Sequence, residues 1–157
     1  MKEIKLTKNK TTFIDDEDYE WLSEWKWNYG SGGYAVRNSR KDECEKRKTI
    51  LMHRIIIGTK KGEETDHING NRLDNRRSNI RPCMRIQNRH NTNINKNNTS
   101  GFKGVVWYEP TKKWRATICI NWKIKSLGYF KNKKEAAIAY NNAAKVYYGN
   151  FAKLNLI

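Results

Sequence analysis

Residues 66–71 read Asp66-His67-Ile68-Asn69-Gly70-Asn71, and the chain continues through Asn75, Ser78-Asn79-Ile80-Arg81 and Asn88. This segment gathers a carboxylate, a histidine and several side-chain amides, a mixture that no hydrophobic core needs. Its Asn-Gly-Asn and Leu-Asp-Asn sequences are typical of turns, so we expect the chain to return to a short second strand. Pro82 then opens a helix from about residue 84. The predicted order is strand, loop, strand and helix.

The residue types in this segment suit hydrolysis of a phosphodiester. One hard divalent cation, bound through oxygen ligands, can neutralise the phosphorane and stabilise the leaving oxygen. A histidine can take a proton from the attacking water. Asp66 and His67 are adjacent, so on an extended strand their side chains point to opposite sides. We expect possible ligands on the first strand and on the helix.

The composition points to a polyanion as partner. The 157 residues carry a net charge of +16 and a pI near 9.9, which favours nucleic acid. The chain is 37% hydrophobic and 11% aromatic, enough for one domain or two small ones with modest cores. No apolar run approaches the roughly 18 residues of a spanning helix, and no secretory signal is visible.

The three cysteines, Cys44, Cys83 and Cys119, form no Cys-x-x-Cys pair. We therefore expect reduced thiols, without a disulfide framework or a structural zinc site. Together with the missing signal, this predicts a protein of the cytoplasm.

Charge and composition divide the chain into two parts. Residues 92–157 hold 12 Lys+Arg and 2 Asp+Glu, a balance of +10, whereas residues 1–91 hold 20 and 14, a balance of +6. The predicted domains are 1–91, made of an N-terminal region (1–49) and a core of about 50–91, and 101–157. The Asn-rich residues 92–100 between them are expected to be a linker. It is either a solvated tether or a segment whose Lys96 and amides track a DNA groove.

In the N-terminal region, the acidic run that begins at Asp15 predicts a helix start, since the helix dipole favours acids there. We expect Tyr19, Leu22 and Trp25 to pack inward. Two strands are predicted, at 34–36 and 49–52.

The C-terminal part predicts a three-stranded antiparallel sheet with one packed helix. A strand at 105–108 and a turn precede Trp114, whose alternation with Arg115 and the following residues indicates one buried and one free face. A third strand runs from about 122 to 127. Asn132 and Glu135 resemble a capping box, and Gly149 is a natural helix stop. The expected inward stripe of the helix contains Ala136, Ala139, Tyr140, Ala143 and Tyr147. The overall fold class is α+β.

The D-H-I-N-G-N and N-I-R sequences, with the downstream Asn, resemble the HNH endonucleases, which have a ββα-metal fold. The resemblance covers roughly residues 50–91, including His53-Arg54. It is greatest to phage and intron-encoded homing endonucleases that nick DNA, and it implies that the expected cytoplasm is that of a bacterial host cell. It implies that His67 is the general base and that Asp66 is a metal ligand. It also implies that Asn79 pins the loop by hydrogen bonds and that Asn88 is the second ligand.

His90 is an alternative second ligand, because it lies two positions from Asn88 and only one of them can face a metal on the same helix. The spacing favours Asn88. An amide ligand suits magnesium or manganese, whereas His90 would favour softer metals.

Arginines surround the proposed phosphate site and predict phosphate clamps rather than a merely solvated surface. They are Arg72, Arg76, Arg77, Arg81, Arg85 and Arg89.

The segment from Gly101 to Ile157 resembles the Apetala-type DNA-binding domain of plant ethylene-response factors, which is also fused to phage HNH enzymes. The matching residues are Gly104-Val105, Trp114-Arg115-Ala116, Leu127-Gly128-Tyr129-Phe130, Glu135-Ala136-Ala137, Ala139-Tyr140, Ala143-Ala144, Gly149 and Asn155. In that family the free sheet face lies in the major groove. Several base-contacting arginines and tryptophans of the plant proteins are absent here, so the target sequence does not transfer.

Carried over by position, this resemblance implies a DNA-facing set of Lys103, Val106, Tyr108, Arg115, Thr117, Cys119, Ile124 and Ser126. Phosphate contacts are expected from Lys112, Lys113, Lys123 and Lys125. Trp107 and Trp114 are expected to be core residues and not residues that stack on bases. Trp122 is expected at an exposed strand edge, and both roles stay open for it.

These observations predict a monomeric, metal-dependent endonuclease that nicks double-stranded DNA at a site and uses one magnesium or manganese ion. A DNA-binding regulator with an inactive nuclease fold is the alternative. An RNA-directed nuclease is less favoured, because the exposed strands carry few aromatics for stacking on unpaired bases.

Overall fold

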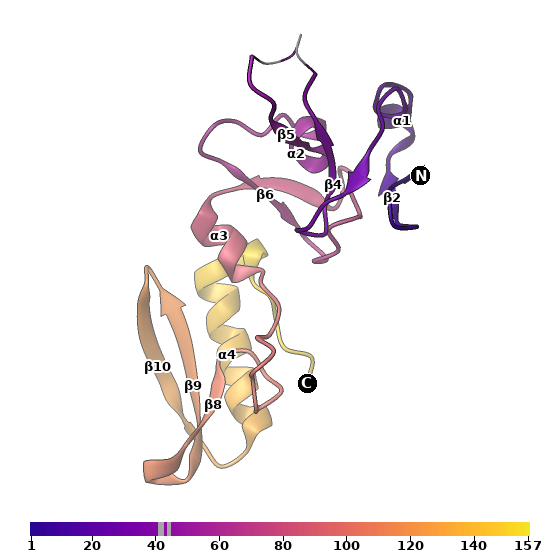
Figure 1. Ribbon diagram of the computed structural model, residues 1–157. Coiled ribbons are helices and arrows are strands. Elements are labelled where there is room, and N and C mark those ends of the chain that lie inside the picture. The colour runs from indigo at the N-terminus through magenta and orange to yellow at the C-terminus, as the bar shows by residue number, and fades with distance from the viewer. Residues whose placement is uncertain (41–42, 44) are drawn as a thin grey trace. The chain divides into compact units, whose positions relative to one another are not determined.

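The computed structural model describes residues 1–40, 43 and 45–157, so the predicted thiol at Cys44 lies outside the described residues. The chain forms two compact units, Met1–Asn88 and Arg89–Ile157. Both are mixtures of small antiparallel sheets and a few helices (Figure 1), which agrees with the α+β class. Each unit is described by itself.

The first unit contains two two-stranded sheets, one three-stranded sheet and short helices. In chain order its elements are β1 (Lys2–Lys5), β2 (Thr11–Ile14), α1 (Asp16–Ser23), β3 (Asn28–Tyr29), β4 (Ala35–Asn38), β5 (Thr49–Leu51), α2 (Met52–Ile56), β6 (Glu64–His67), β7 (Ile80–Cys83) and α3 (Arg85–His90). The boundary between the units falls within α3.

One hydrophobic core unites the first unit. It draws buried side chains from β1, β2, α1, β4, α2 and β7, with Trp27 as its largest member. The indole N–H of Trp27 donates to the Leu22 carbonyl at 2.9 Å, so the ring is buried without an unsatisfied donor. The N-terminal strands and the segment around His67 therefore share one core.

Helix α1 begins at Asp16, at the acidic run as predicted, but it buries a different face. Asp18 and Leu22 are buried, whereas Tyr19 is 38% exposed, so its predicted inward position is wrong. The reason is electrostatic. Asp18 is paired with the guanidinium of Arg77 at 2.7 Å, and this partner lets a carboxylate occupy the inner position.

The predicted strand at 49–52 is one residue too long. Strand β5 ends at Leu51, and Met52 begins helix α2. A helix places Met52 and Ile56 one turn apart on the same face, and both enter the core. This burial outweighs the extended tendency of the apolar run.

Strands β6 and β7 form an antiparallel pair in which Asp66 is opposite Arg81 and His67 is opposite Ile80. Helix α3 follows β7 directly. The order strand, loop, strand and helix is therefore present as the sequence predicted.

The second unit is a three-stranded sheet with one long helix on a single face (Figure 1). Its elements are β8 (Val105–Tyr108), the 3-10 turn η1 (Glu109–Thr111), β9 (Lys113–Ile120), β10 (Lys123–Phe130), α4 (Lys133–Tyr148) and η2 (Gly149–Phe151). The strands pair antiparallel in the order β10-β9-β8, which confirms the predicted architecture. The Asn132 side chain caps α4 by accepting from the Lys134 N–H at 2.8 Å.

The buried stripe of α4 is rotated from the predicted one. Ala136, Ala137, Tyr140 and Ala144 are buried, whereas Tyr147 is 46% exposed. Three of these four buried residues are alanines, which let the helix lie close to the sheet, and Tyr140 is the large side chain among them.

Trp107 also differs from its predicted core position. It is 41% exposed, its ring meets Trp114 edge to face at 5.2 Å, and its indole N–H donates to Glu109 at 2.6 Å. Strand β8 is an edge strand, so Trp107 shields one side of Trp114 and leaves its own outer side in solvent.

Gly104 supports this packing and provides a test of it. A Cβ there would collide with the Tyr140 ring and lie 2.7 Å from the Thr117 carbonyl, and φ is +75°. Gly101 has a similar φ of +79° but open space around it. We expect Gly101→Ala to cost about 1 kcal/mol through backbone strain alone. Gly104→Ala should cost about 1–3 kcal/mol more. Denaturant unfolding of both variants measures the difference, and equal losses would contradict the close packing of Tyr140 on Gly104.

Candidate functional site

His67 is the last residue of β6 and is buried, with 5% of its surface exposed. Its Nε2 lies 3.0 Å from the amide oxygen of Asn75. The ring of His53 meets it at 5.0 Å, nearly perpendicular, and the ring of Tyr34 lies at 5.9 Å. The imidazole is therefore held between an amide and two aromatic rings.

Burial favours the neutral form of both histidines. Burial lowers the pKa of His67, against the opposing effects of the Asn75 hydrogen bond and the Asp66 charge. Burial, with the His67 ring and Arg54 nearby, lowers the pKa of His53 to about 3. A neutral His67 has a lone pair that can accept a proton.

The loop after His67 is fixed by its own polar side chains. Asn79 is buried, donates to the Asp74 carbonyl at 2.8 Å and accepts from the Asn69 N–H at 3.0 Å, which joins the two ends of the loop. Asp74 accepts from the Asn69 amide at 2.9 Å and from two nitrogens of Arg76 at 2.7 Å.

Asp66 is 4% exposed and pairs with Arg81, its neighbour across the strands, at 2.6 Å. Glu64 precedes it by two residues and therefore lies on the same side of β6. The side-chain amide of Asn88, on α3, donates to Glu64 at 2.7 Å. Asp66, Glu64 and Asn88 thus belong to one side of the β6–β7–α3 segment, and His67 to the other.

This donor set fits a hard cation, because carboxylate and amide oxygens are the ligands that magnesium and manganese prefer. Within the described residues, no three His, Cys, Asp or Glu side chains gather closely enough to hold a metal. An ion here would therefore depend on the amide of Asn88 and on water. Glu64 was not predicted, although its i, i+2 spacing from Asp66 on a strand was a usable signal.

The two candidate second ligands have different surroundings. Asn88 is bonded to Glu64, whereas the His90 ring stacks on Tyr148 at 3.6 Å with an interplanar angle of 11°.

The arginines expected as phosphate clamps are largely engaged within the first unit. Arg76 pairs with Asp74, and Arg81 with Asp66. Arg77 binds both Asp18 and Glu17. Arg72 donates to the Gly32 carbonyl at 2.6 Å and lies over the Tyr34 ring at 4.8 Å, whereas Arg85 is exposed on α3.

In the second unit, the sheet face opposite α4 presents several of the predicted contact residues. The strand register places on this face Val106, Tyr108, Lys113, Arg115, Thr117, Cys119, Ile124, Ser126 and Tyr129. The Arg115 guanidinium lies 5.8 Å from the Tyr108 ring and 5.9 Å from the Tyr129 ring. Its Nε is buried and has no hydrogen-bond partner among the described residues.

Other predicted contact residues lie elsewhere. Lys123 and Lys125 are opposite Ile120 and Ile118, so they belong to the helix side of β10, and Lys125 donates to the Tyr147 hydroxyl at 3.2 Å. Trp122 is at the β9–β10 turn, is 63% exposed and lies 4.6 Å from the Arg89 guanidinium.

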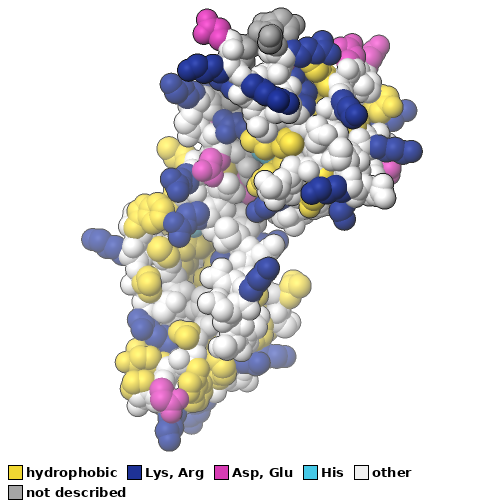
Figure 2. All heavy atoms as spheres, in the orientation of Figure 1, with side chains coloured by type: hydrophobic (Ala, Val, Ile, Leu, Met, Phe, Trp, Pro, Cys, Tyr) yellow, Lys and Arg dark blue, Asp and Glu magenta, His cyan; other side chains and the backbone are white. Residues whose placement is uncertain are grey.

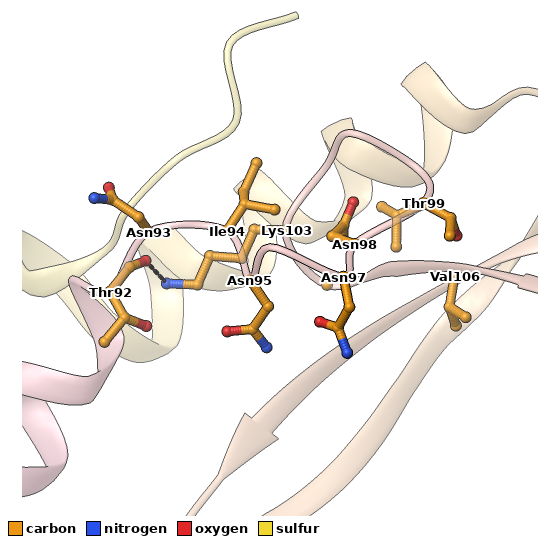
Figure 3. A pocket seen from close by; sticks show the side chains of 11 residues that line it. Thr92, Asn93, Ile94, Asn95, Asn97, Asn98, Thr99, Lys103 and Val106 are labelled. Carbon is orange, nitrogen blue, oxygen red and sulfur yellow. Dashed lines mark hydrogen bonds between the residues drawn. The ribbon is translucent and has the colours of Figure 1, made fainter.

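Lys103 is turned inward. Its Nζ donates at 2.7 Å to the carbonyls of His90 and Thr92, and Figure 3 shows the Thr92 bond beside a pocket of about 290 Å³. Burial lowers the pKa of Lys103 to about 8. In Figure 3 the side chains of Asn95 and Asn97 project to the same side of the expected linker.

The charge of the surface is mainly basic. In Figure 2, Lys and Arg side chains outnumber acidic ones over the visible face. None of the helices in the described part of the chain combines the length and apolarity needed to span a bilayer.

Comparison with known proteins gives two viral relatives, while no family model and no solved structure matches. Protein 3.8 of Escherichia phage T7 is 40% identical over 58 residues, which are 37% of this chain and 48% of that protein. This chain therefore covers about half of the T7 protein's length. The uncharacterized HNH endonuclease L560 of Acanthamoeba polyphaga mimivirus is 28% identical over 152 residues, 96% of this chain and 77% of that protein. The second likeness supports an HNH nuclease family.

Asp74 gives the site a pH-dependent stability. The Arg76 side chain holds the pKa of Asp74 below its usual 3.8, so its contribution is present above that value and is lost as pH falls through the lower folded value. We expect Asp74→Asn to lower the free energy of unfolding at pH 7 by about 1–3 kcal/mol. The difference from wild type should shrink in acid. Urea unfolding at pH 7 and at an acidic pH measures the free energy of unfolding of both proteins, and the exposed Glu20→Gln variant is the control. A loss of stability in Asp74→Asn that is the same at both pH values would contradict the ion pair.

Proposed function

We propose that this protein is a site-directed DNA endonuclease of HNH type that nicks double-stranded DNA. The observation that carries the proposal is the environment of His67. A buried imidazole, whose neutral form burial favours, is held by Asn75 at the end of β6, and the opposite side of this strand bears Asp66 and the Glu64–Asn88 pair. The mimivirus relative named an HNH endonuclease supports the same chemistry, and the net charge of +16 supports a DNA substrate.

In this proposal His67 acts as the general base and removes a proton from the attacking water. Asn79 keeps the loop after His67 in place. A magnesium or manganese ion, held by Asp66 and Asn88, would polarise the scissile phosphate and stabilise the 3′ leaving oxygen. One site per chain favours a monomer that cuts one strand in each binding event.

We assign DNA recognition to the second unit, acting like the Apetala-type domain that its sequence resembles. Its sheet has one face covered by α4 and one open face, with Arg115 between two tyrosines. Such a face can enter the major groove, where an arginine reads guanine.

A regulator that binds DNA with an inactive nuclease fold is the second candidate. The observation in its favour is the Arg81 guanidinium on Asp66, because this pair occupies the carboxylate that would bind the ion. The activity of the purified protein on plasmid DNA distinguishes the two candidates.

His67→Ala tests the catalytic assignment. Loss of a general base typically costs about 10²–10⁴-fold in rate. We therefore expect nicking of supercoiled plasmid in magnesium to fall by at least about a hundredfold, while gel-shift affinity stays near that of wild type. Lys145→Ala, on the exposed side of α4, serves as the control and should keep its activity. Undiminished nicking by His67→Ala would reject the assignment.

Arg115→Ala tests the recognition surface. A bidentate arginine–guanine contact is worth about 1–3 kcal/mol of discrimination, so we expect preference for a site selected from random DNA to fall about tenfold or more. Lys145→Ala removes the same charge from the exposed side of α4 and should change that preference little. Equal effects in competition gel shifts would show that charge alone matters.

A further inference from the structure

Hydrogen bonds link His67 to Asn75, Asn75 to Thr12, and Thr12 to the Leu73 carbonyl. The last bond of this chain determines which atom donates and which accepts in each of the others. The chain ends at the carbonyl of Leu73, which can only accept. It receives the Phe13 N–H and the Thr12 hydroxyl, both at 2.8 Å. The Thr12 hydroxyl thereby donates its proton to Leu73, in preference to Met52 Sδ, which is 4.0 Å away and a weak acceptor.

With its proton committed, Thr12 Oγ1 acts as an acceptor toward Asn75. The distance from Asn75 Nδ2 to Thr12 Oγ1 is 2.7 Å, and Met52 Sδ, also an acceptor, lies 3.5 Å from the same nitrogen. If the Asn75 amide were turned by about 180°, its oxygen would face two other acceptor atoms, Thr12 Oγ1 and Met52 Sδ. Asn75 therefore presents its oxygen, and not its N–H groups, to His67.

An amide oxygen needs a proton from its partner. His67 Nε2 must therefore carry the hydrogen in the 3.0 Å contact with Asn75, and the lone pair of the neutral ring is on Nδ1. Thr12 and Asn75 both have 0% exposure, so these hydrogen bonds lie away from the molecular surface.

We infer that Thr12 and Asn75 are positioning residues that hold His67 in the Nε2–H tautomer, so that Nδ1 is the atom that takes the proton from the nucleophile. The inference rests on the proposed function of His67. It extends the site to a buried residue of the N-terminal hairpin, which reaches His67 through Asn75.

The experiment compares wild type with Thr12→Val and Thr12→Ser. Valine keeps the shape of threonine but removes the acceptor that orients Asn75, whereas serine keeps the hydroxyl. The tautomer of His67 is read from ¹⁵N shifts of labelled histidine, with the His67→Ala spectrum assigning the signal among the three histidines. Plasmid nicking and gel-shift affinity are measured on the same samples.

We expect His67 of wild type and of Thr12→Ser to be Nε2–H. In Thr12→Val the Nδ1–H form should become populated, and nicking should fall about tenfold or more at unchanged DNA affinity. A His67 that is Nδ1–H in wild type overturns the inference, whether or not Thr12→Val folds. A Thr12→Val protein with unchanged tautomer and full nicking also overturns it.

The two proposals fail differently. Wild-type protein that shows the Nε2–H tautomer but never cuts DNA would reject the endonuclease, because the spectrum reports the hydrogen-bond chain independently of activity. Wild-type protein that cuts DNA with His67 in the Nδ1–H form would reject the positioning role alone.

Discussion

The fully buried amide of Asn75 is the contact on which the rest of the first unit depends. It joins the loop after β6 to the hairpin β1–β2, far away in sequence, through Thr12. Backbone bonds on either side reinforce the joint, since Phe13 donates to the Leu73 carbonyl and Asn75 donates to the Phe13 carbonyl, both at 2.8 Å. A buried amide group without a partner costs about 1–3 kcal/mol, so these bonds favour the state in which the hairpin, the loop and the His67 ring are packed together.

Buried carboxylates paired with arginine supply the second constraint. Asp18, Asp66 and Asp74 are each at most 4% exposed, and each is bonded to an arginine of the segment 76–81. A buried charge is tolerated only with such a partner. The short arginine-rich segment therefore ties α1, β6 and the loop together, which is a structural role for side chains in a region where the apolar core is small.

The two units divide the available charge differently. Most acids of the chain lie in the first unit, where several of them form ion pairs, whereas residues 92–157 keep a balance of +10 around an open sheet face. In the proposed function, the second unit supplies attraction and recognition and the first supplies the reacting groups. The inward Lys103, bound to two carbonyls, shows that not every cation of the second unit is available for a phosphate.

Local pattern was sufficient for the second unit and for the order of elements around His67. Three local signals predicted the sheet-plus-helix unit: the period-two alternation from Trp114, the helix cap at Asn132 and the helix stop at Gly149. Each of these signals depends only on residues a few positions away. The sequence also singled out Asp66, His67, Asn79 and Asn88 by residue type and spacing. The features that the sequence left undecided depend on contacts between distant segments. Asp18 is buried in place of Tyr19 because Arg77 is its partner, and Met52 begins a helix because its side chain packs in the hydrophobic core. Thr12 bonds to Asn75, which lies far from it in the sequence. Only tertiary structure decides such pairings, because the energy of a buried polar group is determined by the partner that reaches it and not by its position in the chain.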